Sequence, residues 1–577
     1  MNRARQYFVL VCLMLLLGSF LFRLFYLQII SYARFSDIAY RQHNRVLKIE
    51  PRRGTIYDRN MEAMAINLDI QSIFCDPRSV TDKEATAEVL SSTLGVDKTD
   101  LLDKLQKDKS FIWVKRKVDS RTSEKVKALK LKGVHFITES KRNYPNENMA
   151  SHVIGFVNVD NVGLEALELV WDEKLRGEPG WRHLVKDARQ KTVLLKEEET
   201  IPAKNGYNIV LTVDTVIQYI AEDELKKMVK KFNADGGSVV VLDPYNGKIL
   251  AMANYPNFNL NKFAETPRSM VKNAAVCDVY EPGSIFKIVT ASAALNEGVV
   301  SLTDRFDCEM GEYAVAGRVL HDYHPYGMLP FLEVIGKSSN IGTVKVAHKL
   351  GSKRLYEYII KFGFGSKTGV DMPGEVPGIN RPAWEWTRSD ITTVPIGQGI
   401  AVTSLQLACA VGVVANGGYL IKPYIVDKIT TWEGGIYKKF EPTVVRKVLE
   451  KETCVKMKKI MKYVVSDGTG KPANSKYYYF GGKTGTAQMV NPQGGYYTDR
   501  YDASFIGFAP VDKPAVVIVV TAKNPHPIHF GGSVAAPAFK GIAERTLQYL
   551  GIKPEKEVPS QTEKLKLKKS KNAVVKA

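Results

Sequence analysis

The amino-acid sequence predicts an α+β protein with a single membrane-spanning helix near its N-terminal end. Strand-rich segments at residues 236 to 254 and 476 to 524 bracket a long region of mainly helical patterns. This order suits one five-stranded antiparallel sheet, flanked by helices, with a helical subdomain inserted between its second and third strands. A long apolar stretch opens the chain, and 577 residues suffice for two or three globular units.

The strands of this sheet follow from short local signals. Residues 236 to 254 give two apolar strands joined by the turn DPYNG, and residues 503 to 524 give a second hairpin. The segment KYYYFGGKTGTAQ at residues 476 to 488 predicts a fifth strand, because its opening aromatic run favours β-structure. Ahead of the sheet, residues 208 to 232 predict a strand and then a helix with apolar residues at helical spacing.

The apolar stretch at residues 7 to 30 predicts the membrane anchor, since about 20 apolar residues cross a bilayer as a helix. A cleaved signal peptide is the alternative, but no small-x-small cleavage site closes the stretch. Two arginines precede it, so the positive-inside rule places residues 1 to 6 in the cytoplasm and the bulk of the chain outside. Arg23 and Gln28 either snorkel at the outer interface or contact another membrane helix.

Between the anchor and the sheet, residues 31 to 205 mix short strands with amphipathic helices at 81 to 95 and 121 to 133. This stretch holds few candidate nucleophiles and predicts a spacer or interaction module. At the other end, the final 25 residues from Lys553 hold eight lysines and three glutamates, which predicts a disordered basic tail.

Composition excludes several classes of function. The net charge is +20, but the basic residues are dispersed and no nucleic-acid-reading motif is present, so we expect no nucleic-acid partner. Cys12 lies in the anchor, and the other five cysteines form no C-x-x-C pair and are expected to be core thiols, neither a zinc site nor a disulfide framework. His526 and His529 lack nearby acidic or thiol ligands, so no metal site is predicted.

A Gly-Lys-Thr triplet at residues 482 to 484 resembles the end of a phosphate-binding loop. Such a loop needs a glycine five positions before Gly482, and Tyr477 stands there instead. The nucleotide interpretation is therefore weak, and Lys483 needs another role.

A serine and a lysine share one turn of a predicted helix that begins near Ser284 and stops at Gly298. Lys287, three residues after Ser284, lies on the same face. A serine hydroxyl needs a base to act as a nucleophile, and a lysine serves when burial lowers its pKa. Taken alone, this pair is more often a helix cap and an exposed lysine.

Two further motifs change that balance. Ser338-Ser339-Asn340 follows 54 residues after Ser284, and Lys483-Thr484-Gly485 follows 145 residues after Ser338. In this order the three motifs are the set of penicillin-binding proteins and class A β-lactamases. With all three, the chain closely resembles the class B penicillin-binding proteins, the monofunctional D,D-transpeptidases of peptidoglycan synthesis.

The resemblance covers nearly the whole chain. RRGTIYDRN at 52 to 60 resembles the membrane-proximal signature of the family, and residues 155 to 180 resemble the pedestal of its division-type members. Met61 and Ser339 depart from the usual glycine and aspartate. The resemblance implies a cytoplasmic tail at 1–6, an anchor at 7–30, an elongated α+β pedestal of the dimerisation type at 31–205, a penicillin-recognising serine transpeptidase domain at 206–552 and a basic tail at 553–577.

The family's catalytic roles carry over to four residues. By resemblance, Ser284 attacks the penultimate D-Ala carbonyl of a stem peptide ending in D-Ala-D-Ala, and Lys287 accepts its proton. Ser338 passes a proton to the leaving D-Ala, and Lys483 supplies a cation for the terminal carboxylate. No metal or organic cofactor is implied.

The same resemblance assigns substrate binding to residues beside these four. Asn340 holds the substrate amide, and the hydroxyls of Thr484 and Thr486 join Lys483 at the carboxylate. Gly485 allows a substrate backbone to approach closely. The backbone N–H groups of Ser284 and Thr486 form the oxyanion hole.

The implied partners are peptidoglycan stem peptides on glycan strands made from lipid II, β-lactams, the cytoplasmic membrane, and a polytopic glycan polymerase with other division proteins. The pedestal favours a septal role. An elongation or spore-wall paralogue, a β-lactamase or β-lactam sensor, and a wall-synthesis scaffold with a vestigial site are the alternatives.

Overall fold

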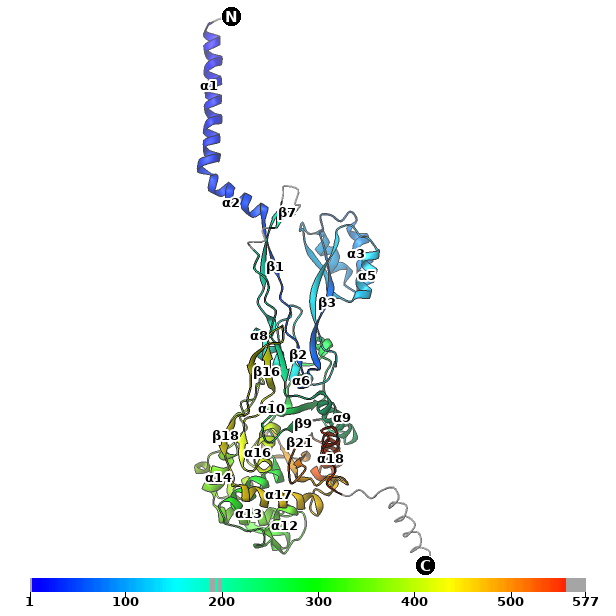
Figure 1. Ribbon diagram of the computed structural model, residues 1–577, viewed down its shortest axis with the longest axis vertical. Coiled ribbons are helices and arrows are strands. Elements are labelled where there is room, and N and C mark those ends of the chain that lie inside the picture. Colours follow the sequence, from blue (N-terminus) through cyan, green and yellow to red (C-terminus); the bar gives the residue numbers. More distant parts are fainter. Residues whose placement is uncertain (1–2, 187–191, 196–199, 557–577) are drawn as a thin grey trace, which may run out of the picture. The chain divides into compact units, whose positions relative to one another are not determined.

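A computed structural model describes residues 3–186, 192–195 and 200–556 (Figure 1). The chain divides into two compact units. One comprises Met1–Arg53 and Arg176–Gly206, and the other comprises Gly54–Leu175 and Tyr207–Ala577. The predicted tail at 553–577 lies outside the described residues from position 557 onward.

The first unit begins with the predicted anchor. Helix α1 (Arg3–Phe25) runs into a π-helical turn (Tyr26–Ile30), and α2 (Tyr32–His43) follows. The apolar helix Arg3–Ile30 is 28 residues long, or about 42 Å at 1.5 Å per residue, which exceeds the hydrocarbon thickness of a bilayer. The same unit contains a three-stranded sheet in the order β1 (Asn44–Ile49), β6 (Gly180–Lys186) and β7 (Thr192–Leu195).

The second unit contains a seven-stranded sheet that the sequence did not predict. Its strands follow the order β17-β16-β8-β2-β3-β4, and β5 also pairs with β3. Ile56 pairs with Ile209 in parallel, while Leu211 pairs with Val426, so three distant parts of the chain join in one sheet. The bounds are β2 (Ile56–Tyr57), β3 (Ala63–Cys75), β4 (Ile112–Val118), β5 (Val134–Asn143), β8 (Asn208–Leu211), β16 (Val426–Thr430) and β17 (Ile436–Lys439).

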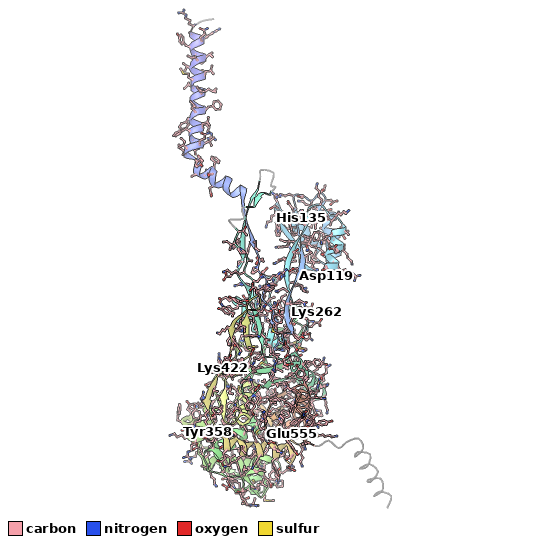
Figure 2. All side chains as sticks on the ribbon, viewed as in Figure 1. Asp119, His135, Lys262, Tyr358, Lys422 and Glu555 are labelled. Atoms are coloured by element: carbon pink, nitrogen blue, oxygen red, sulfur yellow. The ribbon has the colours of Figure 1, made fainter. Side chains whose placement is uncertain are left out.

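Helices α3 (Lys83–Leu94), α4 (Lys98–Gln106) and α5 (Ser120–Ala128) share a hydrophobic core with β3 and β4, and the predicted helices at 81 to 95 and 121 to 133 are confirmed. Each begins at an aspartate cap. Asp119, labelled in Figure 2, accepts a hydrogen bond from the Thr122 N–H at 2.9 Å.

The predicted five-stranded antiparallel sheet is confirmed, in the order β10-β9-β21-β20-β19. Alternating residues of its strands face two different helix layers. Val239 and Val241 share a core with helices α9 and α18, whereas Val240 shares a core with α11 and α16. The bounds are β9 (Gly236–Leu242), β10 (Ile249–Tyr255), β19 (Gly481–Val490), β20 (Tyr496–Ala509), β21 (Val516–Lys523), α9 (Thr215–Lys231), α11 (Lys287–Asn296), α16 (Ser404–Asn416) and α18 (Gly531–Tyr549).

The helical subdomain lies between β10 and β19, as the sequence predicts. Its further helices are α10 (Ala274–Cys277), α12 (Phe331–Gly336), α13 (Asn340–Leu350), α14 (Ser352–Lys361), α15 (Asp390–Thr393) and α17 (Lys451–Ser466). Its short strands are β11 (Arg305–Asp307), β12 (Glu312–Val315), β13 (Arg318–His321), β14 (Met328–Pro330), β15 (Tyr419–Ile421) and β18 (Val444–Lys447). Three short helices, α6 (Ser151–Ile154), α7 (Ala166–Val170) and α8 (Asp172–Arg176), complete the N-terminal half.

The fifth strand, predicted over residues 476 to 488, is confirmed from Gly481 onward and is wrong for the aromatic run at 476 to 480. This run is a bend, and β19 begins only at Gly481. The N–H groups of Tyr477 and Tyr478 both donate to Ser475 Oγ, at 3.0 and 3.3 Å. These two N–H groups are therefore not available for hydrogen bonds to a neighbouring strand. The rings of Tyr478 and Phe480 are buried instead in the core under α18.

All six cysteines are free. Of the five predicted to be core thiols, those at positions 75, 308, 409 and 454 are buried, whereas Cys277 is only half-buried.

Candidate active site

The first motif lies where a short 3₁₀ turn (Gly283–Phe286) passes into α11. Ser284 is half-buried on this turn, and Lys287, at the start of α11, is fully buried. Gly283 has a φ of 52°, and a side-chain carbon there would lie 2.9 Å from the Thr486 carbonyl oxygen. Only glycine therefore lets this turn pack so closely against β19.

The second motif meets the first through the lysine amine. Lys287 Nζ donates to the Ser338 carbonyl oxygen at 2.6 Å, to Asn340 Oδ1 at 2.7 Å and to Ser338 Oγ at 3.2 Å. No hydrogen bond joins Lys287 Nζ to Ser284 Oγ in the described part of the chain. The lysine amine is therefore positioned by the second motif.

The third motif completes the cluster from the sheet. Lys483 is fully buried on β19, and its Nζ donates to Ser338 Oγ at 2.9 Å and to the Thr484 carbonyl oxygen at 3.1 Å. Ser338 Oγ thus lies between two lysine amines that come from different motifs. The order of the motifs in the sequence predicts that the three motifs lie close together, but it does not predict that Ser338 Oγ lies at the centre of the cluster.

Burial changes the ionisation of both lysines. It lowers the pKa of Lys287 to about 7, and the nearby Asp322 carboxylate opposes that shift. Burial also lowers the pKa of Lys483 well below its usual range, and the charge of Lys287 adds to the effect. Two ammonium groups this close repel each other, so near neutral pH the pair retains an amine that can accept a proton.

Strand β19 forms one edge of the five-stranded sheet. The Thr486 hydroxyl accepts a hydrogen bond from the Gly531 N–H at 3.1 Å, and the Thr484 hydroxyl shares one with Thr469 at 2.8 Å. At Gly485 a side-chain carbon would lie 2.5 Å from Ser504 Oγ and 2.8 Å from the Ile285 side chain. The missing side chain at Gly485 therefore also lets the Ser284 turn pack on the strand.

One charged residue of the cluster has no motif to reveal it. Asp322 follows β13, and its carboxylate accepts hydrogen bonds from the first residues of α13. It stands in the unremarkable sequence HDYH, 16 residues before Ser338. Its role arises from the tertiary fold, so sequence reasoning missed it.

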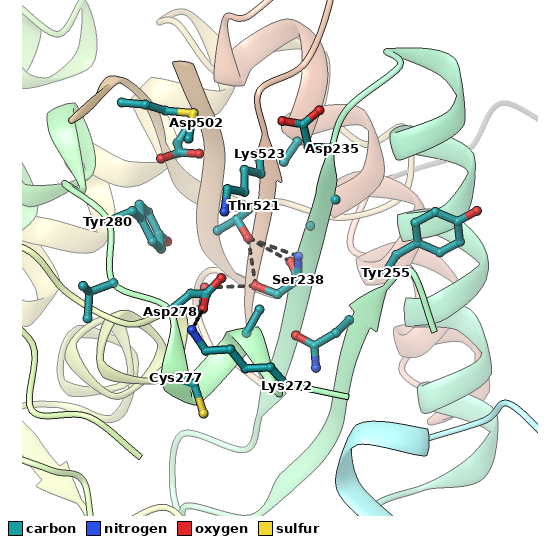
Figure 3. Close-up of a pocket in the computed structure, with 18 of the residues that line it drawn as sticks. Asp235, Ser238, Tyr255, Lys272, Cys277, Asp278, Tyr280, Asp502, Thr521 and Lys523 are labelled. Atoms are coloured by element: carbon teal, nitrogen blue, oxygen red, sulfur yellow. Dashed lines mark hydrogen bonds and ion pairs between the residues drawn. The ribbon is translucent and has the colours of Figure 1, made fainter. Parts of the chain in front are cut away.

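A cavity of about 740 Å³ lies at the end of the five-stranded sheet (Figure 3). Its wall includes Ser238, Thr521, Tyr280 and Asp502, and burial raises the pKa of Asp502 to about 7. Glu281 also lines the cavity, but none of the four predicted catalytic residues does. The cavity is therefore a neighbour of the motif cluster and not the place where the motifs meet.

Comparison with protein families gives two matches that together span most of the chain. A family model described as the penicillin binding protein transpeptidase domain matches residues 237–544. A second model, described as the penicillin-binding protein dimerisation domain, matches residues 48–211.

Individual relatives cover almost the full length. The chain is 37% identical over 545 residues to stage V sporulation protein D of Bacillus subtilis, covering 92% of this chain and 84% of that protein. It is 30% identical over 552 residues to peptidoglycan D,D-transpeptidase FtsI of Escherichia coli, covering 94% and 91%. The crystal structure of penicillin binding protein 3 from Mycobacterium tuberculosis with aztreonam superposes with a TM-score of 0.70 at 28% identity, covering 88% of this chain and 98% of that one.

Proposed function

Because this chain belongs to the class B penicillin-binding proteins, we propose that Ser284, Lys287, Ser338 and Lys483 carry out its peptidoglycan D,D-transpeptidase reaction. The observation that carries the proposal is the meeting of two buried lysine amines at Ser338 Oγ, beside the turn that holds Ser284. The substrate is a stem peptide ending in D-Ala-D-Ala, and β-lactams acylate the same serine.

In the acylation step, the Ser284 hydroxyl attacks the penultimate D-Ala carbonyl carbon. Lys287 takes the hydroxyl proton, because burial lowers its pKa to about 7 and leaves much of it neutral near pH 7. The N–H groups of Ser284 and Thr486 stabilise the negative charge that develops on the carbonyl oxygen. Asn340 holds the substrate amide.

In the second half of the step, the carbon–nitrogen bond to the terminal D-Ala breaks. Ser338 Oγ gives its proton to the leaving amine and is reprotonated by the Lys287 ammonium group, which carries the proton taken from Ser284 and lies 3.2 Å away. Lys483 Nζ, at 2.9 Å, holds Ser338 Oγ from the other side. An amine from a neighbouring stem then attacks the serine ester, forms the cross-link and returns a proton to Ser284.

The terminal carboxylate of the substrate is placed on the edge of β19. The carboxylate favours the protonated form of Lys483 against the effect of burial, so Lys483 supplies a positive charge when substrate is bound, and the hydroxyls of Thr484 and Thr486 supply hydrogen bonds. Gly485 leaves room for the substrate backbone beside the strand.

Labelling with a fluorescent penicillin, followed by mass mapping of the labelled peptide, tests this assignment. We expect the label on Ser284, and Ser284→Ala abolishes it. Ser292→Ala is the matched control, because that buried hydroxyl on α11 has no hydrogen-bond partner among the described residues. Label on another residue refutes the assignment, and fast steady-state destruction of penicillin favours a β-lactamase.

The proposal extends to topology and domain limits. The apolar helix Arg3–Ile30 supports a single-pass protein of the cytoplasmic membrane. We place residues 1–6 inside the cell, the anchor at 7–30, the pedestal at 31–205, the transpeptidase domain at 206–552 and the tail at 553–577. A reporter active only outside the cytoplasm is expected to work after residue 577 and to fail before Met1, and the opposite pattern refutes the orientation.

A septal role with a polytopic glycan polymerase as partner is the physiological part of the proposal. The likeness to FtsI of Escherichia coli supports it, and the likeness to stage V sporulation protein D supports a spore-wall role as the second candidate. Depletion that gives filaments supports the septal role. A defect confined to spores favours the second candidate, and rounded cells with normal septa favour elongation.

A further inference from the structure

The carboxylate of Asp322 collects three hydrogen bonds from consecutive residues of the second motif and α13. Ser339 Oγ donates at 2.5 Å, the Asn340 N–H at 2.5 Å and the Ile341 N–H at 3.1 Å. The first N–H groups of a helix lack partners within the helix, and a negative charge beside them is favourable. Asp322 is thus an anionic cap supplied by the β12–β13 hairpin, far from α13 in the chain.

The residue beside Asp322 fixes the side chain of Asn340. The His321 carbonyl oxygen accepts a hydrogen bond from Asn340 Nδ2 at 2.9 Å, which turns Asn340 Oδ1 toward Lys287 Nζ at 2.7 Å. Asp322 therefore holds the backbone N–H of Asn340, and the His321 carbonyl oxygen holds its side-chain amide.

Ser338 needs such support because of its backbone. Its φ of 64° is in the left-handed region, which is unfavourable for a residue with a side chain and persists only where the surroundings hold it. The bonds from Asp322 hold the next three residues, so the strained turn keeps both oxygens of Ser338 on Lys287 Nζ.

We propose that Asp322 is a positioning residue for the transpeptidase reaction, which fixes the start of α13 so that Ser338 and Asn340 face Lys287. The proposal deepens the function proposed above and rests on it. Asp322 does not touch the reacting atoms and acts through the second motif.

The charge of Asp322 gives the proposal a readout that a purely structural cap would not have. Lys287 is faced by Asp322 after β13, by Cys308 after β11 and by Lys483 on β19. The Asp322 carboxylate raises the pKa of Lys287 against the effect of burial. Removing this charge therefore moves the ionisation of Lys287 to lower pH.

The test measures the second-order rate of acylation by a fluorescent penicillin between pH 5 and 9, on the full chain in detergent. Asp322→Asn is expected to lower the plateau rate roughly 10- to 100-fold, the cost of a misplaced catalytic group, and to shift the acid limb to lower pH. Asp307→Asn is the matched control. Asp307 lies at the end of β11, is exposed, and accepts only the Glu309 N–H at 2.9 Å among the described side-chain contacts. We expect wild-type behaviour from that control.

Two results overturn the proposal: a wild-type rate in Asp322→Asn, or a lowered rate with an unmoved acid limb and a lower melting temperature. If Asp322→Asn does not fold, Asp322→Glu decides, because it keeps the charge and displaces it. For Asp322→Glu, a lower plateau rate of acylation with the acid limb at its wild-type pH supports the positioning role, and a wild-type plateau rate refutes it. Unlabelled wild-type protein would refute the proposed function itself, so the two failures are distinguishable.

Discussion

The substitution Lys287→Arg tests whether a neutral lysine amine activates Ser284. An amine with the ordinary pKa of 10.5 is neutral in only about one molecule in 3,000 at pH 7, whereas a pKa of about 7 leaves about half of the molecules neutral. Arginine stays protonated in proteins and cannot accept the serine proton. The substitution therefore keeps a cation beside Ser338 but removes the base.

The expected loss follows from the contribution of general-base catalysis, about 10²- to 10⁴-fold in rate. Stopped-flow acylation by a fluorescent penicillin measures it, and circular dichroism with thermal melting shows whether the variant folds. Lys345→Arg is the control, because Lys345 is a half-buried lysine on α13 whose amine pairs with Glu309 at 2.5 Å. We expect that control to acylate at the wild-type rate.

The wild-type pH profile gives an independent check of the same reasoning. Below the pKa, Lys287 is protonated and cannot act as a base, so the rate should rise about tenfold per pH unit and level off above about pH 7. Because Lys287 and Lys483 interact, the measured value belongs to the pair. An acid limb near pH 10, or a folded Lys287→Arg variant within threefold of wild type, would refute the reasoning.

Three further outcomes are expected. Gly485→Ala places a carbon 2.5 Å from Ser504 Oγ, so it should cost about 1–3 kcal/mol in thermal unfolding and at least about 10-fold in acylation, and a wild-type rate would contradict the packing described. Arg142→Met removes the buried ion pair between Arg142 Nε and Glu168, now at 2.6 Å, and should lower the free energy of unfolding in urea by about 3–5 kcal/mol, while an unchanged midpoint would argue against the importance of this pair. The penicilloyl ester on Ser284 should last for many minutes, because no carboxylate hydrogen-bonds that serine within the described ranges, and rapid release of label would show that a base activates water.

Local signals in the sequence predict the five-stranded sheet well. The hairpin at 236 to 254 depends on a tight turn between two apolar strands, and both signals lie within one short segment. The aromatic run at 476 to 480 has the same strand preference but bends, because Ser475 Oγ accepts the N–H groups of the next residues. At this position, hydrogen bonds from the backbone to a side-chain acceptor outweigh the strand propensity of the aromatic residues, and the rules for predicting strands do not consider such an acceptor.

Distant pairings explain the parts that sequence reasoning missed. The seven-stranded sheet joins Ile56, Ile209 and Val426, and no short window contains any two of them. Asp322 is similar, since two of its three donors are backbone N–H groups, which leave no pattern of side chains to find. The motifs at Ser284, Ser338 and Lys483 were predictable because each carries its chemistry in three consecutive or nearly consecutive residues.

Strand β8 has a consequence for how the chain can be divided. It pairs with β2, from the N-terminal part of the chain, on one side and with β16, from the transpeptidase match, on the other. Strand β8 therefore joins these two parts of the chain in one sheet. A fragment starting at residue 237, where the transpeptidase match begins, would lose β8 and α9. Such a fragment would expose to solvent the edge of β16 and the apolar sheet residues that α9 covers, and this exposure promotes aggregation. The second unit is thus expected to melt in one cooperative transition, and excised catalytic fragments should begin before β2.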